Sequence, residues 1–482
     1  MPLIDDDAFT ELYNNLDTER RDDHEFYVDC TDVRGGDELA EKLCDDLSHT
    51  TGFLHVLFSG NIGCGKSSEL RHFAKSMSNE KPTTGRKRFF PVLIDTAEYL
   101  DRSNVNITDI LLTIISETAD TMKKELSIEF RATLIDRVWN VVKQYVPTSL
   151  EANIGNVKSP GVEAIAAQLK VSLQRLQIDP TVREKVREAL AKETLTFYDE
   201  INLAFTEARL ALKKHLVKDG DGGYYDFVII LDNLEKVERF DDKAEGMESH
   251  RALFVDKAEQ FKSLQAHLVL TVPLELVRAE GKRLEQGYSA PPIILPNIKT
   301  EYRGTEHRPY QAGRDRLKDI LRERIPGKKD VDTLFEAPAL DFIIDNCGGH
   351  VRNFLRSARE SVSYARYTAP ISLNAAQRSI ARQVRIFADV MRPDDWSLVA
   401  ELELSKTQEW NGHDPARARL LEQTVVLEYV NGGTNDVYNE PRPWYGVNPI
   451  IRKMSPFTDA QTELREAREK TVLPSDRQKQ TP

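Results

Sequence analysis

Short apolar runs alternate with helical periodicity along much of this chain. The runs are rich in β-branched and aromatic residues, which predicts buried strands at residues 53–59, 88–95, 225–232, 267–271 and 291–296. Elsewhere, as at residues 107–122 and 249–264, apolar residues recur every three or four positions, which predicts helices. Strands that alternate with helices in this way predict an α/β fold with a parallel sheet at its core.

One long segment breaks the alternation. Residues 123–216 contain no clear strand pattern, whereas residues 128–142 and 179–217 show long helical periodicity with opposite charges four positions apart. Residues 147–160 contain Asn, Gly, Ser and Pro and predict a loop between these helices. We therefore expect a mostly helical insertion of about ninety residues between two strands of the sheet. Such an insertion suits contact with a partner, although charged surface helices more often serve solvated packing alone.

The remaining patterns complete a division into regions. The second half turns helical and locally basic after the last predicted strand, and then carries helices followed by a hairpin whose turn is Asn431-Gly432-Gly433. Helices followed by a hairpin predict a winged-helix-like unit, and the polar end of the chain predicts a flexible tail. The predicted regions are a helical N-terminal segment (1–50), a sheet core with its insertion (51–305), a helical lid (306–388), the winged-helix-like unit (389–456) and the tail (457–482).

Composition and charge limit the location and the partners that we expect for this protein. The chain has 482 residues and a formal net charge of −12, and no uncharged run approaches the ~20 residues that a membrane span needs. Its N-terminus is acidic where a secretory signal would be basic and then apolar, so we expect a cytoplasmic protein without a membrane partner. The acidic total argues against a chain-wide nucleic-acid surface. The four cysteines are scattered and suggest neither a disulfide framework nor a zinc site.

The strongest chemical motif follows the first predicted strand. The sequence GNIGCGKS at residues 60–67 fits the phosphate-binding pattern G-x-x-x-x-G-K-[ST] and precedes a helical pattern at residues 68–77. Its glycines allow several backbone N–H groups to point toward one polyphosphate, and the helix adds its positive end. Lys66 would reach the β- and γ-phosphates, and Ser67 would bind Mg²⁺. The residues predicted to bind the nucleotide are Gly60, Asn61, Ile62, Gly63, Cys64, Gly65, Lys66, Ser67 and Ser68.

A second nucleotide motif ends at Asp232. The apolar run at residues 225–232 closes on this acid, which is the Walker B pattern and predicts that Asp232 holds Mg²⁺ from the side opposite Ser67. Many P-loop ATPases place an acid directly after it, but this chain has Asn233. Either Glu235 reaches the attacking water from the next turn, or Asn233 aligns it poorly and hydrolysis is slow. Asp95, at the end of another predicted strand, either polarises water or serves as a turn or cap.

Two further residues are predicted to respond to the γ-phosphate. Thr271 ends the strand that follows Walker B, so that its hydroxyl could bond the phosphate or the water, or simply terminate the strand. Arg352 follows a glycine pair in the first turn of a helix, which suits an arginine that reaches the γ-phosphate from a lid. For Arg352, a basic surface for nucleic acid and a surface salt bridge are the alternatives. Residues 27–34 are either an adenine-side segment or scaffold.

With both motifs, Thr271 and the sequence GGHVR at residues 348–352, residues 30–385 resemble the AAA+ and STAND-like P-loop ATPases of prokaryotes, in which a terminal winged helix is common. The resemblance implies ATP-dependent switching between compact and extended or oligomeric states, with Thr271 as sensor 1 and Arg352 as sensor 2. FSG at 58–60, GCGKSSEL at 63–70 and WYGVNP at 444–449 also resemble a bacterial subgroup of ATPases, some tied to antiviral defence. The family's arginine finger cannot be assigned among Arg278, Arg283, Arg303 and Arg308.

The sequence thus predicts an ATP-binding, Mg²⁺-dependent ATPase, slow if Asn233 aligns the water poorly. It would act as a molecular switch that couples the nucleotide to a protein partner or to self-assembly, in bacterial defence or regulation. The alternative is a DNA-binding initiator or loader that acts through the winged helix, although residues 428–443 carry only Arg442 as a cation. A small-molecule kinase fits the lid and the winged-helix-like unit poorly, and no N-K-x-D motif for a GTPase is present.

Overall fold

The fold is described from a computed structural model of the chain. The residues described are 6–19, 23–35, 39–79, 87–145, 179–191, 194–215, 223–238, 241–242, 247–328, 330–366, 368–405, 410–431 and 442–472. They form two compact units, each discontinuous in sequence. The sheet unit comprises Ala40–Ser59 and Glu69–Ile293, and the loop unit comprises Met1–Leu39, Gly60–Ser68 and Ile294–Pro482. The predicted loop at residues 147–160 lies outside the described residues.

The sheet unit is built on a five-stranded sheet with the order β2 (Phe89–Asp95), β3 (Asp226–Asp232), β6 (His267–Thr271), β1 (His55–Ser59) and β7 (Ile293–Ile294). Strands β2, β3, β6 and β1 pair in parallel, as predicted. Every residue of β1, β3 and β6 is buried, which explains why these strands read as unbroken apolar runs rather than as alternating patterns. Because the strands are parallel, their carboxyl ends share one edge of the sheet.

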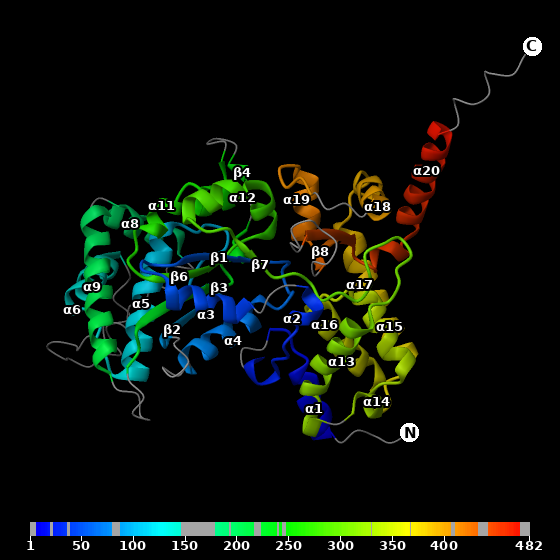
Figure 1. The fold of residues 1–482 in the computed structure, drawn as a ribbon, viewed down its shortest axis with the longest axis horizontal. Helices are drawn as coiled ribbons and strands as arrows, with labels where there is room; N and C mark the ends of the chain where they lie inside the picture. Colours follow the sequence, from blue (N-terminus) through cyan, green and yellow to red (C-terminus); the bar gives the residue numbers. More distant parts are fainter. Residues whose placement is uncertain are drawn as a thin grey trace, which may run out of the picture. The chain divides into compact units, whose positions relative to one another are not determined.

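Helices lie on both sides of this sheet, which confirms the α/β fold (Figure 1). In that view α3 (Leu39–His49) and α4 (Lys66–Asn79) are drawn below the strands, and α11 (Ala258–Lys262) and α12 (Leu274–Tyr288) above them. The predicted helix at residues 107–122 is α5 (Ile107–Leu126), which begins at a capping box made by Asn106 and Asp109. Helix α10 (Ser249–Phe254) and α11 replace the single helix predicted at residues 249–264.

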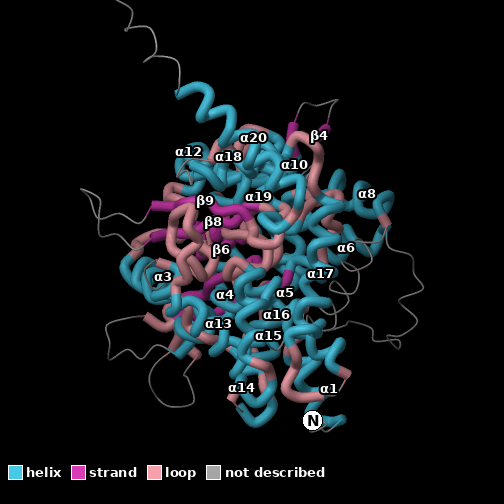
Figure 2. Tube along the Cα trace, turned by 90° about the vertical axis from the view of Figure 1, so that its right-hand side faces the viewer, coloured by secondary structure: helices cyan, strands magenta, loops and turns pink. Residues whose placement is uncertain are grey.

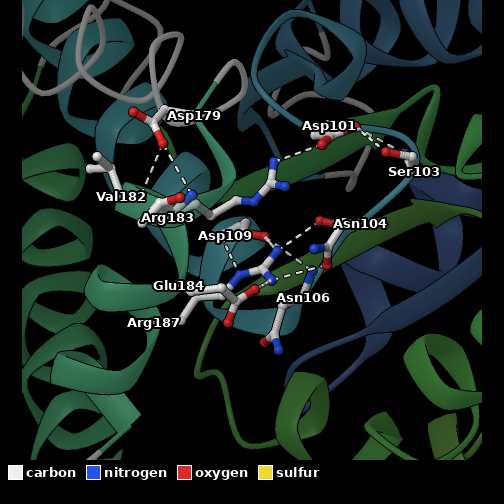
Figure 3. A network of polar contacts seen from close by, with 11 residues as sticks. Asp101, Ser103, Asn104, Asn106, Asp109, Asp179, Val182, Arg183, Glu184 and Arg187 are labelled. Atoms are coloured by element: carbon white, nitrogen blue, oxygen red, sulfur yellow. Dashed lines mark hydrogen bonds and ion pairs between the residues drawn. The ribbon is translucent and has the colours of Figure 1, made fainter. Parts of the chain in front are cut away.

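The described part of the insertion is helical, as predicted. It contains α6 (Ala132–Tyr145), α8 (Pro180–Ala191) and α9 (Thr194–Lys214). Two buried arginines of α8 attach it to the segment that follows β2 (Figure 3). Arg183 donates to Asp101 Oδ2 at 2.8 Å, and Arg187 donates to Asp109 Oδ1 at 3.1 Å and to Asn104 Oδ1 at 3.0 Å. These buried ion pairs fix the insertion on the chain that leaves the carboxyl edge of the sheet.

The loop unit has a helical core. Helices α13 (Gln311–Arg324), α14 (Val331–Leu334), α15 (Ala337–Cys347), α16 (Val351–Ala365) and α17 (Leu373–Val390) occupy the region predicted as a lid (Figure 2). Leu12 and Leu16, from α1 (Asp6–Asn15) and the turn after it, belong to the same apolar core as Leu321 and Phe354. Helix α1 and the turn after it therefore stabilise these helices. Helix α15 ends at Gly348, whose left-handed φ of 59° suits a residue without a Cβ.

The last part of the loop unit contains α18 (Asp395–Ser405), α19 (Pro415–Glu422) and the antiparallel hairpin of β8 (Val426–Asn431) and β9 (Arg442–Val447). The hairpin was predicted, although its turn at residues 432–441 lies outside the described residues. Helix α20 (Ser455–Val472) stands where a flexible tail was predicted, because Pro456 suits a first helical turn and Phe457 is buried. No helix within the described ranges is long and apolar enough to cross a membrane.

Candidate nucleotide-binding site

The backbone of the glycine loop adopts unusual conformations and leaves several N–H groups open. Gly60, Gly63 and Gly65 have φ values of 152°, 91° and 114°, conformations that other residues rarely adopt. Among the described residues, no hydrogen bond engages the N–H groups of Gly63, Gly65 and Ser67, and these three residues are only partly buried. Ser67 lies in the first turn of the 14-residue helix α4, where N–H groups lack intrahelical acceptors. The loop therefore offers several backbone donors to a polyphosphate.

Lys66 is folded back onto the same loop. Its Nζ donates to the carbonyl oxygens of Gly60 at 2.9 Å and of Asn61 at 3.3 Å, and the side chain is 3% exposed. Both hydrogen bonds come from a buried ammonium group, for which burial without hydrogen bonds would be costly. For Lys66 to bind phosphate oxygens as predicted, its Nζ must give up the hydrogen bonds to these carbonyls and bond to the phosphate oxygens instead.

The start of α16 contacts the loop, as the position of Arg352 in the sequence suggested. Arg352 N donates to Gly63 O at 3.1 Å, and its guanidinium lies 3.7 Å from Glu19 Oε1. A Cβ built on Gly63 would come within 2.8 Å of Arg352 Cβ and 2.9 Å of His350 Cε1. Gly63 is therefore required by close packing as well as by its φ. The contact places Arg352 beside the predicted phosphate-binding loop, whereas its role toward the γ-phosphate stays a prediction.

His350 caps α16 and holds the loop at the same time. Its Nδ1 accepts from Asn353 N at 3.2 Å, so the Nε2–H donates to Ile62 O at 2.7 Å. The pKa of His350 is lowered to about 3, mainly by burial and in part by the neighbouring cations Arg352 and Lys66. His350 is consequently neutral in the folded protein at ordinary pH, and this neutral tautomer is the one that both hydrogen bonds require.

Two residues that sequence reasoning missed complete the support of the loop. Arg34, 4% exposed at the end of α2 (Thr31–Arg34), donates from Nη2 to Cys64 O at 2.8 Å. Asn297 donates from Nδ2 to Asn61 Oδ1 at 2.7 Å. Residues 27–34 thus end beside the loop, and their predicted adenine-side role stays a prediction. Neither residue belongs to a recognisable motif. The only sequence signal that could have identified them is a polar residue among apolar neighbours.

Asn61 itself links the loop to the C-terminal hairpin. Its Nδ2 lies 3.2 Å from Leu421 O and 3.4 Å from Val426 O, and its Oδ1 also accepts from Glu428 N at 3.1 Å. The residue is 2% exposed, so these bonds satisfy a buried amide. The predicted binding role of Asn61 was a backbone role, whereas its side chain joins residues more than 350 positions away. Cys64 is fully buried, and its Sγ is 3.7 Å from Leu295 O.

In the sheet unit, the predicted acids lie at the carboxyl edge of the sheet. Asp95 ends β2 and is in register with Asp232, which ends β3. Thr96 Oγ1 donates to Asp232 O at 2.8 Å and ties these strand ends together. Asn233 follows in the left-handed conformation, with φ 64° and ψ 11°. The parallel pairing therefore brings together the carboxylates of Asp95 and Asp232, which are 137 positions apart in the sequence.

Thr271 and Glu235 are more deeply placed than the sequence suggested. Thr271 Oγ1 accepts from Leu234 N at 2.8 Å and donates to Leu231 O at 3.2 Å, and the residue is fully buried. Its hydroxyl thus holds the turn after Walker B. Glu235 lies in the 3-10 turn Leu234–Lys236 and is 5% exposed. Their predicted roles toward the γ-phosphate and the water stay predictions.

Ser67 in the loop unit and Asp232 in the sheet unit each carry the oxygen chemistry that Mg²⁺ prefers, and their joint role stays a prediction. Mg²⁺ in such sites takes few protein ligands and keeps phosphate oxygens and waters. Ser67 is partly exposed and its hydroxyl has no partner among the described residues, and Asp232 supplies a carboxylate. The described residues contain no group of three His, Cys, Asp or Glu side chains that could hold a metal by themselves. Bound Mg²⁺ would neutralise charge on the β- and γ-phosphates.

No protein-family model matches this chain, and no curated protein matches it in sequence. Among solved structures, Drosophila ORC bound to DNA is similar with a TM-score of 0.36 and 12% identity, covering 96% of this chain and 94% of that one. The Aeropyrum pernix ORC1 protein in complex with DNA is similar with a TM-score of 0.36 and 12% identity, covering 95% of this chain and 97% of that one. The Aeropyrum pernix ORC2 protein in ADPNP and ADP complexes has a TM-score of 0.39 and 11% identity, covering 92% of this chain and 99% of that one. At such low scores, any functional assignment has to rest on the chain's own residues.

Proposed function

We propose that this protein binds ATP through residues 60–67 and hydrolyses it, as a switch that couples the nucleotide to a protein partner or to self-assembly. The observation that carries the proposal is the loop itself. Three glycines with positive φ precede the start of α4, and the N–H groups of Gly63, Gly65 and Ser67 have no partner among the described residues. A polyphosphate is the ligand that uses such a set of donors together with Lys66.

Each residue has a defined task in this proposal. The backbone N–H groups of the loop bind the α- and β-phosphates, and Lys66 binds the β- and γ-phosphates once its Nζ leaves the loop carbonyls. Ser67 and Asp232 would hold Mg²⁺. Arg352 senses the γ-phosphate, and Thr271 holds the Walker B turn whose position responds to it. Either Glu235 or Asp95 orients the attacking water, which is the choice taken up below.

The proposal is tested by ATP binding and phosphate release with wild type and Lys66→Ala. We expect Lys66→Ala to lose ATP binding by at least about tenfold, because the ammonium group is the principal side-chain cation of the loop. Lys75→Ala is the matched control, since Lys75 is exposed on the same helix α4. Equal ATP binding by Lys66→Ala and Lys75→Ala would refute the proposal.

The switching part of the proposal is supported by how Asn61 and His350 attach the loop to other parts of its unit. A nucleotide that displaces Lys66 from Gly60 O and Asn61 O must alter the carbonyls beside Asn61, whose side chain reaches Leu421, Val426 and Glu428. The hairpin and α19 are therefore the elements that would respond first. The particle size measured with and without a slowly hydrolysed ATP analogue tests for assembly, and an unchanged size would leave a protein partner as the output.

Binding to DNA is the second candidate. Exposed Arg378, Arg382 and Arg385 lie along α17, four and three positions apart, which places them on one side of a helix. Two of the similar structures described above are complexes with DNA. Binding of duplex DNA that weakens steeply with added salt, and that the triple change of these arginines to Gln removes, would favour this candidate. The predicted link to antiviral defence stays a prediction.

A further inference from the structure

Asn233 occupies a backbone position that restricts which residues fit. It follows Asp232 directly and has φ 64° and ψ 11°. Asn adopts this left-handed conformation more readily than most residues, whereas a Glu there would be strained. Asn233, which stands where many P-loop ATPases have an acid, therefore fits the local backbone. This chain has an amide and not an acid directly after Asp232, so a catalytic acid has to come from another position.

The side chain of Asn233 points to that other position. Its Nδ2 donates to Asp95 Oδ1 at 2.8 Å, and its backbone N donates to Asp232 Oδ1 at 2.8 Å. Asp95 and Asp232 are register partners on adjacent strands. One residue thus holds both carboxylates of the edge, and it holds Asp95 by a hydrogen bond from a neutral amide.

Asp95 is fixed at one oxygen and open at the other. Its Oδ1 also accepts from Ala97 N at 3.1 Å, so two donors orient the carboxylate. No hydrogen bond from the described residues reaches its Oδ2, and the residue is only partly buried. Glu235, by contrast, is 5% exposed. Of the two predicted candidates, Asp95 therefore has the oxygen that water can reach.

We propose that Asp95 orients the attacking water and takes its proton, and that Asn233 is the positioning residue that aims Asp95. This inference rests on the ATPase function proposed above. The water oxygen forms a bond to the γ-phosphorus while the bond from that phosphorus to the β,γ-bridging oxygen breaks. The electron pair of the broken bond stays on ADP, and the water proton passes to Asp95 Oδ2 and later to solvent. The products are ADP and inorganic phosphate.

The test separates nucleotide binding from turnover in four variants. Asp95→Asn should lower kcat by about 100-fold or more, because a positioned general base contributes about that factor, while ATP affinity stays within about threefold. Glu235→Gln tests the other candidate carboxylate, and its kcat should fall far less than that of Asp95→Asn. Asn233→Gly and Asn233→Asp both tolerate the left-handed backbone, but neither donates to Asp95.

The two Asn233 variants distinguish positioning from a merely structural role. Asn233→Gly should lower kcat by about tenfold with little change in KM for ATP, and Asn233→Asp should lower it further because it sets a like charge beside Asp95. A structural role alone would leave kcat unchanged in both, since both fit the backbone. Thermal unfolding of each variant shows whether it is folded, and Asn233→Gly carries the test if Asp95→Asn does not fold.

The results that would refute the role of Asp95 differ from those that would refute the proposed function. If wild type fails to bind ATP, the proposed function itself is refuted. If wild type binds ATP but releases no phosphate, or if Glu235→Gln loses turnover while Asp95→Asn keeps it, the role of Asp95 is refuted. Wild-type kcat in Asn233→Gly would refute the positioning role of Asn233.

Discussion

The glycine loop and the acidic edge of the sheet are organised by opposite means. In the loop, the backbone donors of Gly63, Gly65 and Ser67 are open, while the side chains of Asn61 and Lys66 are bonded within the chain. At the edge, backbone groups are paired in the sheet, and the open group is a side-chain oxygen of Asp95. In the proposed function, binding would depend on main-chain conformation in the loop, and chemistry would depend on side-chain pairing at the edge. Changes in the two regions should consequently have separable effects.

The largest expected effect disturbs the sheet unit through the ion pair that attaches α8. Arg187 is 8% exposed and donates to Asp109 and Asn104, so Arg187→Ala leaves the carboxylate of Asp109, which is 13% exposed, without its cation. We expect a loss of about 3–5 kcal/mol of unfolding free energy. Chemical denaturation followed by far-UV circular dichroism measures it. Lys185→Ala, exposed on the same helix, is the control and should stay within about 0.5 kcal/mol; similar losses in both variants would contradict the role of the buried pair.

The next effect breaks the loop side. Asn61→Ala removes the side-chain acceptor of Glu428 N and one of the two acceptors of Asn297 Nδ2, which keeps its bond to Glu428 O at 3.0 Å. It should cost about 1–3 kcal/mol of unfolding free energy. A double-mutant cycle with Asn297→Ala isolates their shared bond, and we expect a coupling energy of about 1 kcal/mol. Additive losses would show that the two amides act independently.

The third expected effect is a change of protein stability with pH, which compares His350 in the loop unit with His267 in the sheet unit. The pKa of His350 is lowered from its ordinary value of 6.5 to about 3, so the unfolded chain binds a proton between these values that the folded chain does not. Stability should therefore fall as pH drops below about 6.5, with a slope of about 1.4 kcal/mol per pH unit for one proton. His350→Gln, which keeps a donor for Ile62 O, should reduce the slope by about one proton. The slope that remains should include His267 of the sheet unit, whose pKa is also lowered to about 3 by burial.

The smallest effect concerns the Walker B turn. Thr271→Val keeps the side-chain shape but leaves Leu234 N without its acceptor, which should cost about 1 kcal/mol. Thr271→Ser keeps the hydroxyl and serves as control. If Thr271 only holds the turn, both variants should bind ATP as the wild type does, and weaker ATP binding by Thr271→Val alone would assign it a direct contact with the nucleotide.

Local patterns were enough to predict the elements that carry the motifs. The apolar run at residues 267–271 is β6 itself, and the run that ends at Asp232 is β3, because strands buried on both faces must be apolar throughout. The glycines of residues 60–65 likewise predicted a loop of unusual backbone, which their positive φ values confirm. Helix α20 was missed because its exposed positions are polar and only its start is anchored by Phe457.

What holds the candidate site in place comes from residues that no pattern connects. The bonds from Asn61 to the hairpin, from His350 to Ile62 and from Asn233 to Asp95 join positions 138 to 367 residues apart. Glycine conformation, strand burial and the spacing of a phosphate-binding loop are local properties, so the sequence alone determined them. Which carboxylate keeps an oxygen open, and which side chains are already engaged, depends on strand order and register, and only the tertiary structure decided it.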